Sequence, residues 1–173
     1  MTDFELIKQF QAGEKGAFDE LVKRHYPTTF AMFSRMLREE MSANDLCQET
    51  YIKVYKGLKK FRFKSEFTTW LYRISINVAN NHFKKQKMRE FLSLDRGKDP
   101  ITEVSSESDF ELSPYLWKTI AKLSRKQKMV LILHVFQGLP FKEVAGVMEM
   151  TENSAKVNYH YAIKNLKSIL GVE

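Results

Sequence analysis

The sequence predicts an all-α protein with two small helical domains joined by a flexible acidic linker. Only 7 glycines and 4 prolines interrupt the 173 residues, and apolar residues recur at helical spacing. Hydrophobic residues make up 43% of the chain, which is too many for disorder throughout. Residues 1–92 carry 17 basic and 11 acidic side chains. Residues 93–112 carry 2 basic and 6 acidic side chains, and residues 113–173 carry 9 basic and 4 acidic ones. We therefore predict domains at 1–92 and 113–173, with residues 93–112 as the linker.

The first domain is predicted to begin with short amphipathic helices. Residues 6–10 carry an apolar face, and a second apolar stretch is expected to kink or restart at Pro27, because proline lacks the N–H that a helix needs. Ser42 is expected to cap the next helix, with Asp45 in its first turn, where hydroxyl and carboxylate groups satisfy free backbone N–H groups.

The segment of residues 61–85 interleaves aromatic, basic and amide side chains. Basic side chains neutralise phosphates, and aromatic rings offer faces on which unpaired bases stack. This composition favours a surface that handles single-stranded nucleic acid.

The second domain is predicted to end in a helix-turn-helix. Ser113-Pro114 opens its first helix, Ser124 and Gln127 form a capping box, and Gly138 ends the following helix. A short helix over residues 140–148 and a longer one over residues 152–169, capped by Thr151, complete the domain. Two helices joined by a tight turn in a basic domain are typical of duplex DNA binding.

Bulk properties exclude several classes of protein. The net charge of +7 and pI of about 9.4 indicate a polyanionic partner. The single Cys47 rules out a disulfide framework, and neither a signal peptide nor a membrane span is recognisable, so we expect a cytoplasmic protein. Phosphate-binding loops, HExxH, paired CxxC and GxSxG motifs are absent, and the four histidines are far apart. We expect no enzyme activity, no metal, no cofactor and no small-molecule substrate.

A family resemblance rests on three segments in order. These are NDLCQETYIKVYKGLKKFRFKSEFTTWLYRISINVANNHFKK, an acidic spacer, and LPFKEVAGVMEMTENSAKVNYHYAIKNL. The combination resembles bacterial sigma-70 family RNA polymerase sigma factors, and more narrowly the extracytoplasmic-function (ECF) subgroup, which has only sigma regions 2 and 4. The resemblance implies promoter-specific initiation of transcription. The implied partners are core RNA polymerase (its beta-prime clamp coiled coil and beta flap), promoter DNA, and an anti-sigma factor that is often membrane-anchored in the family.

The resemblance assigns the DLCQET helix to polymerase binding. Acids beside apolar groups on an exposed helix can pair with basic residues around an apolar patch. Alternatively, the apolar members belong only to the core and the acids are solvated. The implied polymerase contacts are Asp45, Leu46, Gln48, Glu49, Tyr51 and Val54.

The next segment resembles the part of the family that melts and reads the minus-ten promoter element. The loop from Phe61 to Phe67 would border a pocket for an extruded base, and the planar amide of Asn77 would read that base. Alternatively, Phe67 and Trp70 anchor the core, and the basic residues form a solvated face. The implied minus-ten contacts are Phe61, Arg62, Phe63, Lys64, Phe67, Trp70, Arg73, Asn77, Asn80, Lys84 and Lys85.

The terminal helix departs from the family's recognition helix, because residues of other types stand where the family has a serine and three arginines. Asn158 can pair with adenine, and Val157 can touch a thymine methyl group unless it belongs to the core. Pro140 stands at a helix start where the family usually has Ser or Thr. The minus-thirty-five element is therefore expected to differ from the familiar one or to be bound more weakly. The implied contacts are Thr151, Ser154, Lys156, Val157, Asn158, His160, Tyr161 and Lys164.

Two other classes of protein remain open from parts of the sequence. A free-standing helix-turn-helix regulator would account for the C-terminal domain, and an RNA-binding protein would account for the aromatic and basic segment. Neither explains DLCQET, FTTWLYRISIN and the helix-turn-helix in this order.

Overall fold

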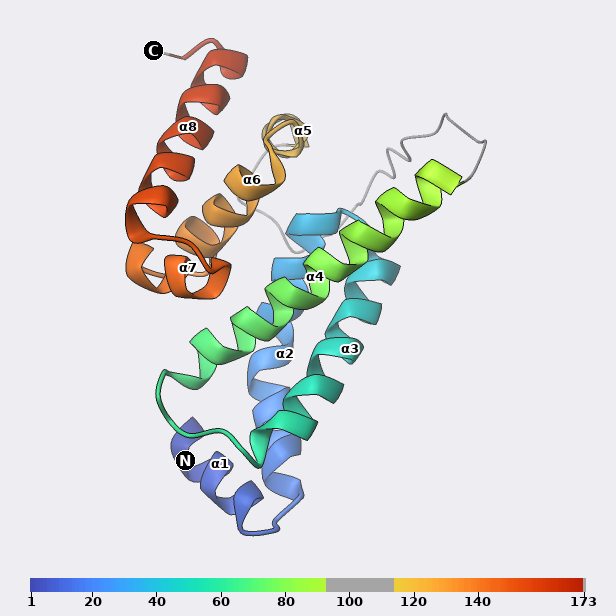
Figure 1. Ribbon diagram of the computed structural model, residues 1–173, viewed down its shortest axis with the longest axis vertical. Helices are drawn as coiled ribbons and strands as arrows, with labels where there is room; N and C mark the ends of the chain where they lie inside the picture. Colours follow the sequence, from blue (N-terminus) through green and yellow to red (C-terminus); the bar gives the residue numbers. More distant parts are fainter. Residues whose placement is uncertain (93–113, 173) are drawn as a thin grey trace. The chain divides into compact units, whose positions relative to one another are not determined.

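The computed structural model describes residues 1–92 and 114–172, and each element within these ranges is helical (Figure 1). The all-α fold class is confirmed. The chain divides into two compact units, one holding the described residues 1–92 and the other residues 114–172. The predicted linker of residues 93–112 lies outside the described residues.

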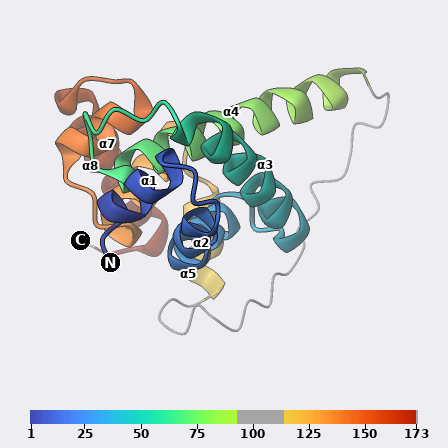
Figure 2. The same ribbon diagram turned by 90° about the horizontal axis from the view of Figure 1, so that it is seen from below.

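The first unit contains α1 to α4. Its helices are α1 (Asp3–Gln11), α2 (Gly16–Leu37), α3 (Glu40–Leu58) and α4 (Phe67–Leu92). Helix α3 packs against both α2 and α4, and Figure 2 looks almost along α2. The core includes the buried side chains of Leu21, Val54, Leu58 and Leu71. Helix α1 adds Leu6, Ile7 and Phe10 to this core, as the short apolar face at residues 6–10 predicts.

Helix α2 passes through Pro27 without a break, so the predicted restart there is wrong. Pro27 is exposed, and its missing N–H and ring clash cost about 3 kcal/mol. The same helix buries Leu21, Met32 and Phe33 on both sides of the proline. Each such side chain contributes roughly 1.5–3 kcal/mol, so the burial outweighs the local cost.

Helix α3 begins at Glu40, before the predicted cap at Ser42. Arg38 takes a left-handed backbone conformation with φ 56°, which ends α2 and allows α3 to start directly. Ser42 therefore lies in the first turn of α3, where its Oγ donates to Glu39 Oε2 at 2.6 Å. The prediction placed the start too late because the buried face of α3 already includes Ala43.

The second unit contains α5 to α8. Its elements are α5 (Pro114–Ala121), α6 (Arg125–Leu131), the π-helix η1 (Ile132–Phe136), α7 (Phe141–Met148) and α8 (Glu152–Leu170). Helix α8 packs against α5, α6 and α7. Gly138, with φ +69°, lies in the turn after η1, as predicted for the end of that helix.

Capping side chains fix the starts of α6 and α8. Thr151 Oγ1 accepts from Ser154 N at 3.1 Å, which confirms the predicted cap of α8. Ser124 Oγ accepts from Gln127 N at 3.3 Å, so its predicted cap of α6 is confirmed as well. The predicted capping box is not complete, since only the bond to Ser124 Oγ is formed. Gln127 Oε1 instead accepts from Asn165 Nδ2 of α8 at 3.2 Å.

His134 links η1 to the helix-turn-helix. Its Nδ1 lies 2.8 Å from the carbonyl oxygen of Leu139, and its ring stacks on Phe141 with centroids 4.0 Å apart. Tyr159 of α8 meets the same ring edge-on at 4.9 Å. The histidine is thus a half-buried packing residue that joins the turn before α7 to α8.

Candidate nucleic-acid interface

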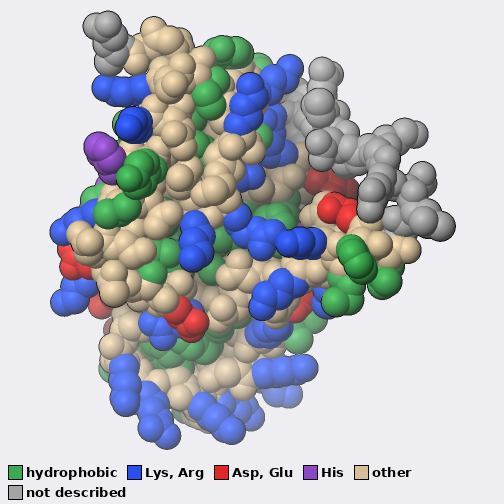
Figure 3. Space-filling model, turned by 45° about the horizontal axis from the view of Figure 1, so that its top comes forward, with side chains coloured by type: hydrophobic (Ala, Val, Ile, Leu, Met, Phe, Trp, Pro, Cys, Tyr) green, Lys and Arg blue, Asp and Glu red, His purple; other side chains and the backbone are tan. Residues whose placement is uncertain are grey.

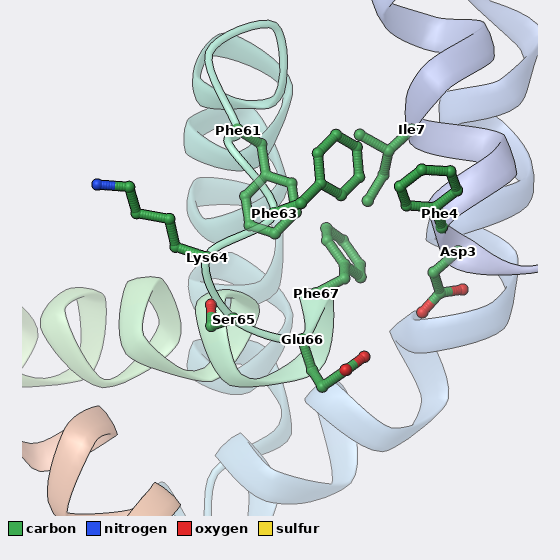
Figure 4. A pocket seen from close by; sticks show the side chains of 9 residues that line it. All are labelled: Asp3, Phe4, Ile7, Phe61, Phe63, Lys64, Ser65, Glu66 and Phe67. Atoms are coloured by element: carbon green, nitrogen blue, oxygen red, sulfur yellow. The ribbon is translucent and has the colours of Figure 1, made fainter.

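A pocket lies where the loop between α3 and α4 meets α1 (Figure 4). Its volume is about 440 Å³. Figure 4 shows the rings of Phe4, Phe63 and Phe67 gathered around it, while Lys64 points away. The lining residues are Asp3, Phe4, Ile7, Phe61, Phe63, Lys64, Ser65, Glu66 and Phe67. The predicted loop thus borders a hollow of aromatic walls with carboxylates among its lining groups.

The loop is strained at Phe63, which has φ 55°, a conformation that bulky residues rarely adopt. Three contacts hold it there. The ring centroid of Phe63 lies 4.7 Å from that of Phe4 and 5.0 Å from that of Phe61, and Lys8 Nζ lies 4.9 Å above the Phe63 ring. Packing and cation–π attraction offset a backbone cost of about 1–2 kcal/mol. Helix α1 therefore fixes the conformation of the loop.

Helix α1 also holds the beginning of the loop through Gln11. The Gln11 amide nitrogen donates to the carbonyl oxygens of Leu58 at 3.1 Å and Phe61 at 3.0 Å. At the other end of α1, Asp3 accepts from Arg24 Nη1 at 2.6 Å, and the ring nitrogen of His25 lies 2.8 Å away. These contacts attach α1 to α2 and to the loop at once.

The aromatic residues at the base of the loop belong largely to the core. Phe61 is 9% exposed and Phe67 is 4% exposed, and both also line the pocket. Trp70 is half-buried, with its ring centroid 5.0 Å from that of Phe61 and 6.0 Å from that of Phe67. Phe67 is therefore a core residue, as the alternative to a DNA contact predicted, and Trp70 is a core residue in part.

Helix α4 presents a polar face beyond the loop. Arg73, Asn77 and Lys84 are exposed and lie at steps of four and seven residues, so they share one face of the helix. Asn80 on this face is half-buried, whereas Ile76 between them is buried. Of the minus-ten contacts that the resemblance implies, the exposed ones are Arg62, Lys64, Arg73, Asn77, Lys84 and Lys85. Lys and Arg side chains are spread widely over the face drawn in Figure 3.

Helix α3 separates its predicted contact residues into exposed and buried groups. Asp45 and Gln48 are exposed and Glu49 is half-buried. Leu46, Tyr51 and Val54 are 4%, 7% and 0% exposed. Val54 has no exposed surface, so the structure does not support a direct contact of its side chain with polymerase. All three residues hold the helix in place from the core.

Other residues of α3 form an apolar surface that the contact prediction missed. Ile52 and Tyr55 are 55% and 39% exposed, and Phe18 of α2 lies beside Tyr55 with ring centroids 5.0 Å apart. A shallow hollow of about 380 Å³ is lined by Phe18, Gln48, Tyr51, Ile52, Tyr55 and Lys56. Ile52 and Tyr55 lie on the same face of the helix as its acidic residues, and this position could have identified them as contact residues. No nearby residue in the sequence identifies Phe18 as part of the surface.

Two buried groups of α3 carry raised pKa values. Burial raises the pKa of the Cys47 thiol from its ordinary value of 9.0 to about 12. Burial also raises the pKa of Tyr51, whose hydroxyl lies 3.1 Å from Thr29 Oγ1. Both side chains therefore stay neutral at physiological pH and belong to the packing of the helix.

Helix α8 presents its predicted contact residues on the face opposite the core. Ala155, Ala162 and Leu166 are buried, and Val157 and Tyr161 on the other side are 43% and 49% exposed. The alternative that Val157 belongs to the core is therefore wrong. The exposed predicted contacts are Thr151, Lys156, Val157, His160, Tyr161 and Lys164, and Ser154 and Asn158 are half-buried.

Within the described residues 1–92 and 114–172, no cluster of His, Cys, Asp or Glu side chains is arranged to hold a metal ion. No helix in those ranges combines the length and the apolar character that crossing a bilayer requires.

Comparisons with family models match both units. Residues 21–89 match the model of sigma-70 region 2, and residues 114–166 match that of sigma-70, region 4. The first match begins after α1, so the α1 residues of the pocket lie outside it.

Comparisons with known proteins extend over most of the chain. It is 33% identical over 159 residues to the RNA polymerase sigma-H factor of Pseudomonas aeruginosa, covering 85% of this chain and 82% of that one. It is 32% identical over 162 residues to the ECF RNA polymerase sigma-E factor of Escherichia coli K12, covering 86% and 84%.

Two solved structures share the fold. The sigma factor RpoE of Bartonella quintana, in complex with the anti-sigma factor NepR, has a TM-score of 0.80 at 19% identity, covering 90% of this chain and 98% of that one. CnrH, in complex with the cytosolic domain of CnrY, has a TM-score of 0.71 at 22% identity, covering 98% and 97%.

Proposed function

The chain belongs to the sigma-70 family, in its ECF group of RNA polymerase sigma factors, and from that premise we propose how its two units divide the work. The first unit binds core RNA polymerase and opens and reads the minus-ten element. The second unit reads the minus-thirty-five duplex. The observation that carries this proposal is the presence of both sigma regions, in order, in one chain.

The pocket beside Phe63 receives one base of the separated strand. Extruding a base from the duplex costs a few kcal/mol, which contacts in the pocket must offset. Aromatic walls supply stacking surface, with about 1–3 kcal/mol per stacked base. The strained loop is already held by α1 before DNA arrives, so little further ordering is needed on binding.

The exposed face of α4 guides the strand into this pocket. Arg73 and Lys84 neutralise phosphates, and the amide of Asn77 donates to and accepts from a base edge. Asn77 lies one helical turn beyond Arg73 on the same face, so it can reach a base while Arg73 holds the backbone.

The exposed part of α3 binds the polymerase clamp coiled coil. Asp45 and Glu49 pair with basic residues of the partner, and Ile52 with Tyr55 supplies apolar contact beside Phe18. An apolar centre with a charged rim is the usual composition of a protein interface. The buried residues Leu46, Tyr51 and Val54 keep α3 in position.

An anti-sigma factor controls the protein by covering these faces. RpoE, which shares the fold, is bound to the anti-sigma factor NepR, and CnrH, which also shares it, is bound to the cytosolic domain of CnrY. The exposed apolar residues Ile52 and Tyr55 are expected to be shielded when the protein is not engaged with polymerase.

Catalysis in this scheme belongs to polymerase, and the chain acts as a dissociable specificity subunit. A free-standing regulator or an RNA-binding protein would need only one of the two sigma regions. Run-off transcription tests the proposal: purified chain and core polymerase from the same bacterium are incubated with its genomic promoter fragments, and start sites are mapped. New start sites that require the chain support it, and transcription indifferent to the chain overturns it.

A further inference from the structure

The exposed face of α8 lacks the arginine side chains that are typical of a helix that reads guanine. α8 contains no arginine, the residue that most often pairs with guanine in the major groove. Its exposed centre holds Val157 and Tyr161 instead, one helical turn apart. The face therefore offers apolar surface at its centre, beside the exposed polar side chains of Lys156, His160 and Lys164.

The polar neighbours on α8 are already engaged within the helix. Asn158 Nδ2 donates to the carbonyl oxygen of Ser154 at 2.8 Å, which disfavours the predicted pairing of this amide with adenine. Lys156 Nζ lies 2.8 Å from Glu152 Oε1 in an exposed ion pair. Each group keeps further hydrogen-bonding capacity, but these contacts hold both side chains along the helix rather than extended towards a base edge.

We propose that Val157 and Tyr161 make α8 a reader of thymine methyl groups in the minus-thirty-five duplex. The thymine methyl is the apolar group that base pairs expose in the major groove. Positions four apart on a helix are separated by about 6 Å along its axis, a span that reaches two successive base pairs at a rise of about 3.4 Å. This inference rests on the proposed function, because it presumes that α8 enters the groove.

Charge on the same helix supports duplex DNA as the occupant of this face. Lys164 and Lys167 are exposed on either side of the core residue Leu166, and residues 113–173 carry 9 basic against 4 acidic side chains. Lysine at these positions neutralises phosphates along the groove while the apolar pair contacts the bases. A purely apolar protein partner would not require this surplus of positive charge.

Deoxyuridine substitution tests the proposal, since it removes only the methyl group from thymine. Promoters found by start-site mapping are resynthesised with single deoxyuridines in the minus-thirty-five element, and holoenzyme affinity is measured. We expect about fourfold weaker binding at one or two positions, the factor for one buried methyl-sized group. With Val157→Ala, thymine and deoxyuridine DNA should bind equally at one of these positions, whereas Tyr161→Phe should keep the difference.

The matched control is Lys164→Ala, which should weaken binding equally on thymine and deoxyuridine DNA and reduce its salt dependence. The proposal is overturned if no thymine in the element responds to deoxyuridine, or if Val157→Ala weakens both DNAs alike. It is also overturned if Val157→Ala and Tyr161→Ala leave promoter binding intact and weaken only an anti-sigma complex. In each of these cases the holoenzyme still initiates transcription, so only the proposal about thymine fails. If the proposed function itself is wrong, the chain does not support initiation at all.

Discussion

Phe63 and Asn77 show how single residues divide the work at the proposed minus-ten site. Phe63 takes a left-handed conformation, and its ring is held between Phe4 and Phe61. Asn77 is exposed on α4, with buried Ile76 and Val78 as its neighbours in the chain. Asn77 does not line the pocket, so the two residues suit separate tasks. The aromatic wall offers a stacking surface to an unpaired base, and the exposed amide can read a base edge further along the strand.

Replacing the free amide should change promoter choice without loosening the complex. Asn77→Ala is expected to lower transcription from the best promoters about tenfold or more and to alter the preferred minus-ten base, since a good base contact is worth roughly 1–3 kcal/mol. Affinity for core polymerase should stay within twofold. The matched control is Gln86→Ala, an exposed amide about half a turn away around α4, which should leave promoter choice unchanged. Equal loss of core binding by Asn77→Ala contradicts this role.

Cys47 predicts a dependence of stability on alkaline pH. Its pKa is raised by burial to about 12 from an ordinary 9.0, so the folded state holds the thiol proton more tightly than the unfolded state. The resulting stability is fully present below about pH 9 and is lost as pH rises towards about 12. Denaturant unfolding should show a smaller fall over this window for Cys47→Ala than for the wild type. An identical fall in both proteins contradicts the assignment.

At the scale of helices, α1 and the turn of α3 near Gly57 position the loop. Gln11 of α1 reaches the carbonyl groups at the end of α3, and Trp70 of α4 packs over Gly57. An added Cβ at Gly57 would lie 3.0 Å from Trp70 Cζ2, closer than carbon atoms normally approach. The loop is thus supported from three helices at once.

Gly57→Ala should move the Trp70 ring despite the better helix propensity of alanine. Alanine is about 1 kcal/mol more favourable than glycine in a helix interior. We expect the clash with Trp70 to cancel or exceed that gain in the free energy of unfolding. Emission excited at the red edge of tryptophan absorption, where tyrosine does not absorb, reports Trp70 alone in a Trp117→Phe background, and urea unfolding gives the free energy of unfolding. Gly16→Ala, where an added Cβ meets nothing within 4 Å, should be neutral or stabilising. Stabilisation by Gly57→Ala equal to that of Gly16→Ala contradicts the packing argument.

Charge reversal on α3 tests its proposed contact with polymerase. Asp45→Lys combined with Glu49→Lys should reduce core binding by at least a hundredfold while the protein stays folded, because both positions keep exposed surface. Glu14→Lys with Glu20→Lys makes the same change of net charge at exposed positions outside α3 and should bind normally. Holoenzyme assembly by the α3 variant at wild-type affinity, measured by fluorescence anisotropy, contradicts the assignment.

The sequence predicts helices well where the signal is local. The caps at Ser124 and Thr151 and the stop at Gly138 depend on neighbouring residues, and the structure confirms them. The restart predicted at Pro27 and the cap predicted at Ser42 are wrong. Burial along α2 outweighs the local cost of proline, and the left-handed Arg38 lets α3 begin before Ser42.

The parts of the site that come from distant elements had no signal in the sequence. Phe4 and Phe63 are 59 positions apart in the printed numbering, and their contact is created by packing of α1 against the loop. Phe18 joins the apolar surface of α3 in the same way. Local patterns also left open whether Leu46 and Val54 face outward, since an amphipathic helix has the same spacing whichever partner covers it.

At the scale of the whole molecule, two basic helical units are carried on one chain. Residues 1–92 and 113–173 carry net charges of +6 and +5, and residues 93–112 carry −4. Each basic unit suits a separate stretch of promoter DNA, and the two stretches together give a specificity that neither unit provides alone. The central claim is that the first unit separates DNA strands only while it is bound to polymerase.

Permanganate footprinting tests this claim most directly, because permanganate oxidises thymines that have lost their stacked partners. A promoter identified by start-site mapping is treated with core polymerase alone, with the chain alone, and with both. The account predicts reactive thymines in the minus-ten region only when both are present, and strongly reduced reactivity with Asn77→Ala. Reactivity with the chain alone, or fully paired DNA in the presence of an assembled holoenzyme, would contradict it.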